Sequence, residues 1–403
     1  MLTRGRLLFT ACSLLTVLLL AVATLVAANE RQNDDGSDSL YKYLAVFTEV
    51  FGLVDRAYVD EQDPADLMAG AFEGTLDALD PFAMYVPSDR IELYEQLREV
   101  GENHSGLTVL KERGVAYIVS VVEGSPAAEA GFEPQQIIAA INGERTRLMP
   151  LLEIQSTFAG PAGTTIEIER LDQGVKDDLT LTLGTYPPPP LEVHGERGVA
   201  VIRLPRIAEG SSGDVATSLR TVLSDVPGVP GVDHRELLVL DLRGSTGGDA
   251  REAYRIAALF TRGELGALLR RGEAVEDFQA DEEPLWNGTL AILVDRGTQG
   301  AAEVLAQVLR QTIEAELVGE NSFGHAGQAS LVRLSSGDRI QITDSFFTGP
   351  DREPIREGLE PDQRVRRPFA PDEESTVDEV LEEGLDWLLD PPAEEPEEER
   401  EAA

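Results

Sequence analysis

The chain contains very little lysine. Among its 403 residues lysine occurs at positions 42, 111 and 176, and none follows Lys176. Every other basic residue is arginine, whose guanidinium stays charged at any working pH and therefore cannot act as a general base. We therefore expect no catalytic lysine in the second half of the chain.

Cysteine is almost absent as well. The one cysteine, Cys12, lies inside an apolar segment near the N-terminus. Disulfides, thiol nucleophiles and cysteine-ligated metals are therefore excluded for the rest of the chain. His104, His194 and His234 show no metal-ligand spacing, and no phosphate loop or dinucleotide fingerprint occurs. We expect neither a metal nor any other cofactor.

Positive charge is scarce throughout the chain. Lysine and arginine total 34 against 73 aspartates and glutamates, which gives a formal net charge of −39. Such a field repels nucleic acid and anionic lipid headgroups, so we expect no nucleic-acid partner. Part of the charge is local: residues 391–403 read PPAEEPEEEREAA and predict a disordered acidic tail.

One long apolar run is present, at residues 7–28 behind Arg4 and Arg6. A positive flank followed by an apolar stretch that ends in small residues is typical of an export signal. The run is also long enough to span a bilayer as a helix. Residues 1–28 are therefore interpreted as a signal peptide or an inner-membrane anchor, and residues 29–38 as a polar linker. Either way the folded part lies outside the cytoplasm, periplasmic or otherwise extracytoplasmic.

Hydrophobic periodicity divides the remainder into three regions. Residues 39–102 carry apolar residues at helical spacing and predict a helical N-terminal region that stops near Pro81. Residues 103–185 predict a small β-rich domain, and the prolines at 187–190 form a stiff spacer. Strand and helix patterns then alternate over residues 186–390, which predicts a βαβ-type core. The expected fold class is α+β.

The individual elements are predicted from apolar alternation for strands and from 3.6-residue spacing for helices. The predicted strands are residues 115–122, 137–141, 165–170, 179–183, 199–204, 237–242 and 290–294. The predicted helices are residues 127–130, 151–158, 214–223, 249–260, 301–313 and 377–389.

Several segments, taken in order, resemble motifs of one protease family. Residues 79–85 read LDPFAMY, residues 238–248 read LVLDLRGSTGG, residues 318–325 read VGENSFGH and residues 358–362 read GLEPD. Together with the β-rich domain at 103–185, they resemble the carboxy-terminal processing peptidases, or tail-specific proteases, which carry a PDZ domain. The resemblance implies a ClpP/crotonase-like core and a serine-type endopeptidase that uses a serine–lysine dyad.

The catalytic residues of that family do not carry over. The nucleophile is the middle serine of an S-A-S-A-S-E run, and residues 298–303 read TQGAAE, which places Gly300 at that position. The general base is the lysine of F-G-K, which corresponds to His325 here. The assisting glutamine corresponds to Ala329, with Gln328 one position short. The resemblance therefore implies a peptidase fold without its dyad.

Two hydroxyls offer a displaced nucleophile. Thr298 and Ser322 lie near His325 in sequence, and a neutral histidine can act as a base for a hydroxyl within hydrogen-bond reach. The competing interpretations are a helix N-cap for Thr298 and an ordinary loop histidine for His325.

Backbone groups of the same region correspond to the family's oxyanion site. The resemblance places the amides of Gly247, Gly248 and Ala301 where the carbonyl oxygen of a substrate would bind. The two glycines are explained equally well by a tight strand-to-helix turn.

The PDZ-like region keeps its binding loop. Ser105, Gly106, Leu107 and Thr108 correspond to the loop that receives a peptide's C-terminal carboxylate, beside a groove helix at residues 151–158. Such domains add the peptide as an edge strand. The alternative is that the domain packs on the core as a regulatory lid.

Our first hypothesis is a non-catalytic relative of the carboxy-terminal processing peptidases. It would bind C-terminal peptides of envelope proteins as a scaffold or regulator of proteolysis, alone or with an active protease or adaptor. The alternatives are an active endopeptidase in which Thr298 or Ser322 pairs with His325, and a structural envelope protein with an unused PDZ groove.

Overall fold

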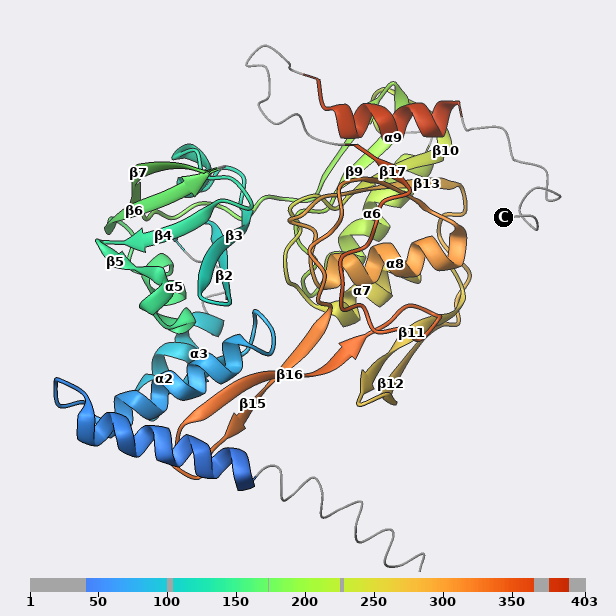
Figure 1. Cartoon of the computed structure of the whole chain (residues 1–403). Helices are drawn as coiled ribbons and strands as arrows, with labels where there is room; N and C mark the ends of the chain where they lie inside the picture. The colour runs from blue at the N-terminus through green and yellow to red at the C-terminus, as the bar shows by residue number, and fades with distance from the viewer. Residues whose placement is uncertain (1–40, 100–103, 173, 225–227, 366–376, 391–403) are drawn as a thin grey trace, which may run out of the picture. The chain divides into compact units, whose positions relative to one another are not determined.

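The computed structural model describes residues 41–99, 104–172, 174–224, 228–365 and 377–390 (Figure 1). The predicted signal segment, linker and acidic tail lie outside the described residues. The chain divides into two compact units, residues 1–71 and 72–403. Each unit is described by itself below.

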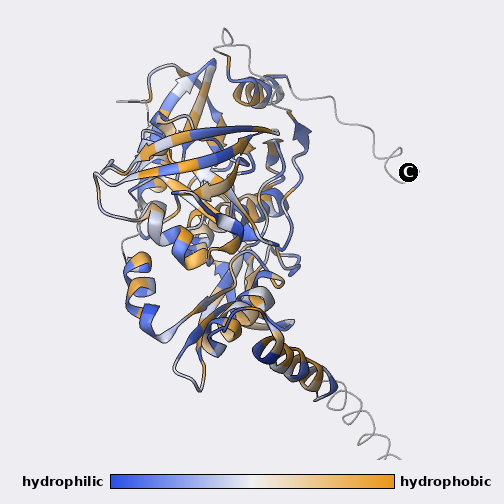
Figure 2. Cartoon of the chain, turned by 60° about the vertical axis from the view of Figure 1, so that its left-hand side comes forward, coloured by the Kyte–Doolittle hydropathy of each residue, from blue (hydrophilic) through white to orange (hydrophobic). Residues whose placement is uncertain are grey.

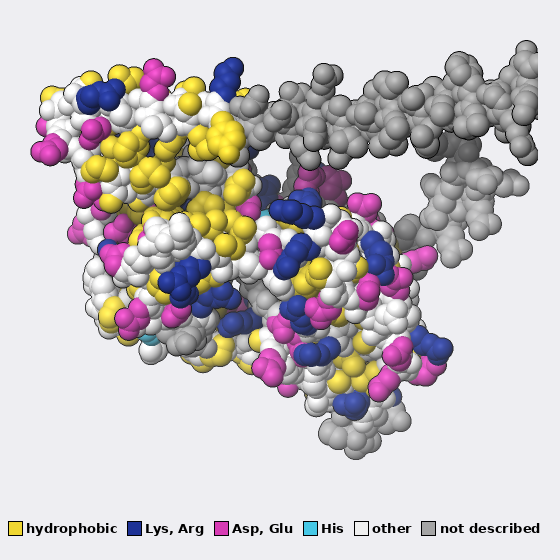
Figure 3. All heavy atoms as spheres, turned by 90° about the horizontal axis from the view of Figure 1, so that it is seen from below, with side chains coloured by type: hydrophobic (Ala, Val, Ile, Leu, Met, Phe, Trp, Pro, Cys, Tyr) yellow, Lys and Arg dark blue, Asp and Glu magenta, His cyan; other side chains and the backbone are white. Residues whose placement is uncertain are grey.

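Within the first unit the structure describes residues 41–71, which are mainly helical. A helix occupies residues 41–57, and α2 (Pro64–Asp77) begins in this unit and continues into the second. Asp63 accepts the amide of Ala65, and Pro64 stands at the first helical position, which favours the start of α2 there. Apolar side chains of helix 41–57 lie at the surface, and Figure 3 shows apolar atoms gathered on the side of the view where the N-terminal helices lie. Within the described ranges no helix is long and apolar enough to cross a membrane.

Residues 104–184 fold into an antiparallel sheet with two covering helices. The strands pair in the order β2-β3-β4-β6-β7, with β5 on β4, so β2 lies at an edge. The elements are β2 (Leu107–Glu112), β3 (Val115–Val121), α4 (Pro126–Glu129), β4 (Ile137–Ile141), β5 (Glu144–Arg145), α5 (Leu151–Phe158), β6 (Thr165–Asp172) and β7 (Val175–Thr182). The bounds predicted for β4 and α5 are confirmed at both ends.

The C-terminal domain is built on a mainly parallel sheet. Its strands follow the order β17-β14-β13-β10-β9-β8, all parallel except β8. The strands are β8 (Glu192–Glu196), β9 (Gly198–Arg203), β10 (Val232–Asp241), β13 (Thr289–Val294), β14 (Glu316–Gly319) and β17 (Gln363–Arg364). The helices are α6 (Ser211–Leu223), α7 (Ala250–Ala257), α8 (Ala301–Ile313) and α9 (Glu379–Leu389). The predicted βαβ core is confirmed.

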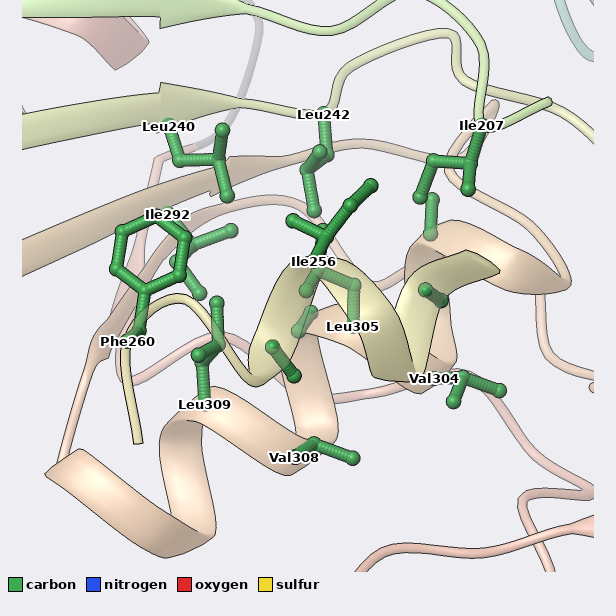
Figure 4. Close-up of a cluster of buried hydrophobic side chains, with 14 of the residues drawn as sticks. Ile207, Leu240, Leu242, Ile256, Phe260, Ile292, Val304, Leu305, Val308 and Leu309 are labelled. Carbon is green, nitrogen blue, oxygen red and sulfur yellow. The ribbon is translucent and has the colours of Figure 1, made fainter. Parts of the chain in front are cut away.

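Both faces of this sheet are buried, as expected for parallel strands. Leu240 and Ile292 point toward the helices on one face, while Val239 and Leu293 belong to the cluster under α9 on the other. Figure 4 shows the first cluster, in which Leu240 and Ile292 of the sheet lie among side chains of α7 and α8. Figure 2 shows apolar and polar residues alternating along many of the ribbons, which is the pattern that fixes the orientation of each element.

A second, antiparallel sheet was not predicted. Its strands follow the order β1-β16-β11-β12, with β15 paired to β16. The strands are β1 (Met84–Val86), β11 (Gly263–Arg270), β12 (Glu273–Ala280), β15 (Gly327–Arg333) and β16 (Arg339–Phe347). The region 39–102 is therefore not purely helical, because β1 pairs with β16 far along the chain. Residues 327–347 form a hairpin, and the start of β15 together with part of β16 reaches the site described next.

Candidate functional site

A cavity of about 320 Å³ lies where two strand-to-helix loops of the C-terminal domain meet. β10 leads through Gly247 and Gly248 into α7, and β13 leads through Gly300 into α8. Parallel sheets bind ligands at this carboxyl edge of their strands. The start of β15, the middle of β16, Phe82 and Arg98 complete the wall.

Gly300 begins α8 and provides no side chain to the cavity. Its backbone is at φ 67° and ψ −113°, a conformation that favours glycine. A Cβ at this position would lie 3.2 Å from the carbonyl oxygen of Gly247. The Gly300 amide donates to Oε2 of Glu303 at 2.9 Å. The position of the expected nucleophile therefore has no side-chain oxygen, and a side chain there would be tight against Gly247 in a conformation that favours glycine.

The three predicted oxyanion donors have different roles. The amide of Ala301 donates to the carbonyl oxygen of Gly247 at 3.1 Å, so this predicted donor is already used inside the loop. The amides of Gly247 and Gly248 meet no acceptor among the described residues. A Cβ at Gly248 would lie 2.3 Å from the oxygen of Ile207, so only glycine fits there. Gly247 and Gly248 therefore form a tight strand-to-helix turn, and their backbone amides also stay without an acceptor among the described residues.

His325 lies on the wall of the same cavity, as the spacing from Gly300 implied. Its ring stacks on Phe82 with ring centres 4.4 Å apart. Burial lowers the pKa of the imidazole below its ordinary value, while Asp80 opposes this shift and Arg356 adds to it. The ring is therefore mainly neutral near pH 7, which is the form that can accept a proton.

The oxygen beside His325 is that of Thr343, a residue the sequence reasoning missed. Thr343 Oγ1 lies 2.9 Å from Nε2 of His325, and both residues line the cavity. Thr343 belongs to β16, where it pairs with Ala329 of β15. The alternation of apolar residues at Ile340 and Ile342 could have indicated this strand, but no local signal links it to His325.

Neither predicted rescue hydroxyl is hydrogen-bonded to His325. Thr298 is fully buried and donates to the carbonyl oxygen of Leu242 at 3.0 Å, while it accepts the amide of Asp295. Ser322 donates to Oε1 of Glu303 and accepts the amide of Leu359. Both hydroxyls thus hold loops together. The predicted Thr298–His325 and Ser322–His325 pairs are not formed.

Glu303 is a buried carboxyl behind the cavity that the sequence reasoning did not single out. It accepts Ser322 Oγ at 2.5 Å, the Gly324 amide at 2.5 Å and the Gly300 amide at 2.9 Å. Burial raises its pKa to about 7 in spite of these three bonds. The carboxyl ties the start of α8 to the loop that ends at His325, and so positions both.

Ala329 occupies the family's glutamine position, with Gln328 beside it in sequence. Ala329 and Gln328 both line the cavity. Gln328 accepts a hydrogen bond from Nη1 of Arg251 at 3.2 Å, and Arg251 is also paired with Glu276. The Gln328 amide is thus oriented by an arginine, with no bond to His325.

The predicted peptide loop of the β-rich domain is formed at the end of an edge strand. Gly106 has φ 81°, and a Cβ there would lie 2.1 Å from Ser125, so only glycine fits. The Leu107 amide donates to the buried Ser105 hydroxyl at 3.1 Å. Gln155 of α5 reaches the carbonyl oxygen of Val109 on β2 at 3.4 Å. β2 is thus an edge strand with α5 beside it, the arrangement in which PDZ domains add a peptide strand.

The family follows from comparison with known sequences. Residues 198–365 match the model of peptidase family S41, and residues 117–169 match that of the PDZ domain. The chain contains a PDZ domain and a peptidase family S41 domain. The resemblance to the carboxy-terminal processing peptidases is thereby confirmed.

The chain also aligns with several proteins named as carboxy-terminal processing proteases. The chain is 26% identical to the carboxy-terminal-processing protease of Bartonella bacilliformis over 372 residues, 90% of this chain and 82% of the relative. It is 32% identical to the carboxyl-terminal-processing protease of Synechocystis over 261 residues, 62% of this chain and 59% of the relative. CtpA of Bacillus subtilis is 25% identical, over 77% of this chain and 66% of that protein.

A solved structure agrees with the fold. The photosystem II D1 C-terminal processing protease superposes with a TM-score of 0.63 at 23% identity, over 80% of this chain and 92% of that one. The α+β class, with a PDZ domain and an S41 core, is confirmed.

Proposed function

We propose that this protein binds C-terminal peptide segments without cutting them and acts as a scaffold or regulator of proteolysis. One observation carries the proposal: Gly300 begins α8 where the family has its serine, in a backbone conformation that favours glycine. Serine-type cleavage needs an oxygen within reach of a base. Position 300 supplies none.

The PDZ domain supports the binding half of the proposal. β2 is an edge strand with α5 packed beside it, and an edge strand of this kind can take a peptide as an added strand. The loop around Gly106 has the left-handed backbone that such a carboxylate loop uses. The peptides would be the C-termini of envelope proteins, because the apolar segment at 7–28 predicts export. An active protease or an adaptor is the further partner we propose.

A paired binding and cleavage experiment tests this function. Fluorescent peptides with a free C-terminus are titrated against the full chain by anisotropy, and the same mixtures are followed by mass spectrometry. We expect saturable binding, weaker binding of the C-terminal amides, and intact peptide after long incubation. Gln155→Trp should block the groove, while Glu153→Trp places the same ring on the exposed side of α5 as a control. Turnover, or binding that Gln155→Trp leaves unchanged, would contradict the proposal.

A second function is favoured by the contact between Thr343 and His325. In that case the Thr343 hydroxyl attacks a peptide carbonyl and passes its proton to the neutral imidazole. His325 then returns the proton to the leaving amine, and water hydrolyses the resulting ester. Cleavage that is lost in Thr343→Val and kept in Thr343→Ser would establish this endopeptidase and exclude the non-cutting role.

A further inference from the structure

One residue that lines the cavity beside His325 has a side-chain amide without a hydrogen bond to the described chain. Gln299 is only 5% exposed and lies on the cavity wall. Its backbone amide donates to the oxygen of Ser245, but its side chain makes no hydrogen bond within the described part of the chain. The buried side-chain atoms without a partner do not include those of Gln299, so its amide is open to the cavity. A ligand in the cavity would satisfy this group.

Backbone donors surround the same space. α7 and α8 pack together, and the residues that begin both helices line the cavity. The N-terminus of a helix carries partial positive charge and favours anions. Asp249 accepts the Arg251 amide and so caps α7. The free amides of Gly247 and Gly248 remain available beside the start of α8.

The cavity wall carries charges of both signs. Two arginines, Arg98 and Arg251, line it against one aspartate, Asp249, in a protein of net charge −39. Arg251 is neutralised by Glu276. Arg98 donates to the Tyr94 hydroxyl at 3.1 Å and has no ion pair with any side chain that the structure describes. Its guanidinium is therefore free to pair with a carboxylate.

The donors at the cavity rim are held in place by a chain of hydrogen bonds. The Tyr94 hydroxyl donates to Oε1 of Gln341 at 2.5 Å, and the Gln341 amide donates to the carbonyl oxygen of Phe82 at 2.7 Å. Phe82 in turn stacks on His325. Arg98 is thus connected to the histidine side of the cavity through fixed contacts.

We propose that this cavity is a second carboxylate site, which binds the C-terminal carboxylate of a peptide between Arg98, the Gln299 side chain and the free amides of Gly247 and Gly248. The C-terminus of a peptide bound in this way would lie where the new C-terminus of a cleavage product would lie. The chain would then hold peptides that have already been trimmed. The inference rests on the proposed function only in requiring that the chain handles peptides.

Histidine NMR tests the site directly, because the chain has only four histidines. The full chain, labelled at the imidazole carbons, is titrated with N-acetyl-Ala-Ala and with its C-terminal amide. We expect the acid to shift the His325 resonance and to raise its titration midpoint, because a nearby anion stabilises the imidazolium. The amide should leave His325 unchanged. Equal effects of acid and amide, or no effect of the acid, would overturn the proposal.

Two variants and two controls locate the ligand. Arg98→Gln and Gln299→Leu should each weaken binding of the acid about tenfold, the loss expected for one strong hydrogen bond. Arg98 is exposed, so its variant tests the site even if Gln299→Leu folds poorly. Arg333→Gln removes an exposed arginine that does not line the cavity and should bind as the wild type does. Unchanged affinity in Arg98→Gln would overturn the proposal.

The PDZ variant separates this site from the proposed function. Gln155→Trp should abolish binding of long peptides in the anisotropy assay and leave the His325 shift with N-acetyl-Ala-Ala intact. If the shift disappears as well, the carboxylate binds in the PDZ groove and the second site is refuted. If long peptides never bind while the shift persists, the PDZ function fails and the cavity site stands.

Discussion

Replacing Gly300 with alanine is expected to destabilise the S41 domain, although glycine-to-alanine changes inside helices often stabilise proteins. The backbone at φ 67° and ψ −113° costs an L-residue about 1–3 kcal/mol. The added Cβ would also lie 3.2 Å from the oxygen of Gly247, closer than an ordinary contact. The reduced entropy of the unfolded chain offsets about 0.4–1 kcal/mol. We expect a net loss of about 1–2 kcal/mol.

Urea and thermal unfolding measure this loss. For a domain of this size, about 1 kcal/mol corresponds to a shift of roughly 2–4 °C in Tm. Gly213 of α6 supplies the matched control, because its φ is not left-handed and a Cβ there meets nothing within 4 Å. Gly213→Ala should therefore raise stability by about 0.5–1 kcal/mol. A Gly300→Ala variant at least as stable as the wild type would refute the strain at this position.

Three further predictions concern buried polar groups. Because burial raises the pKa of Glu303 to about 7 from 4.5, the stability it contributes is full below about pH 4.5 and falls as pH rises through 7. Glu303→Gln should lose this pH dependence, measured as urea midpoints at pH 5 and 8. An identical slope in the variant and the wild type would contradict it. Because burial lowers the pKa of His325, its contribution to stability is present above the ordinary pKa of 6.5 and lost as pH falls below it. The stability of His325→Gln should therefore be less sensitive to acid in the same urea assay. Equal sensitivity in the variant and the wild type would exclude a buried neutral ring. Thr298→Val should lower the free energy of unfolding by about 1–3 kcal/mol, because it leaves the Leu242 carbonyl unpaired. Peptide binding should stay unchanged in the anisotropy assay. A loss of affinity instead would place Thr298 in a binding site.

Local patterns in the sequence predicted most elements of the PDZ domain, and the strands β9, β10 and β13 of the parallel sheet, but not β8, β14 or β17. α8 was predicted at the residues where it occurs, Ala301–Ile313, because its apolar spacing is strong and glycine precedes it. β16 was missed although Ile340 and Ile342 alternate with polar residues. Its pairing with β1, across about 250 residues, has no local signature.

The composition of the chain by itself determined that the S41 domain lacks a serine–lysine dyad, because no fold can supply a lysine that the sequence does not contain. Motif spacing also indicated that Gly300 and His325 share a site, and both line one cavity. Only the tertiary structure decided which oxygen meets the histidine: Thr343, and neither Thr298 nor Ser322. Hydrogen bonds between separate loops made that choice, since they depend on how distant strands come together.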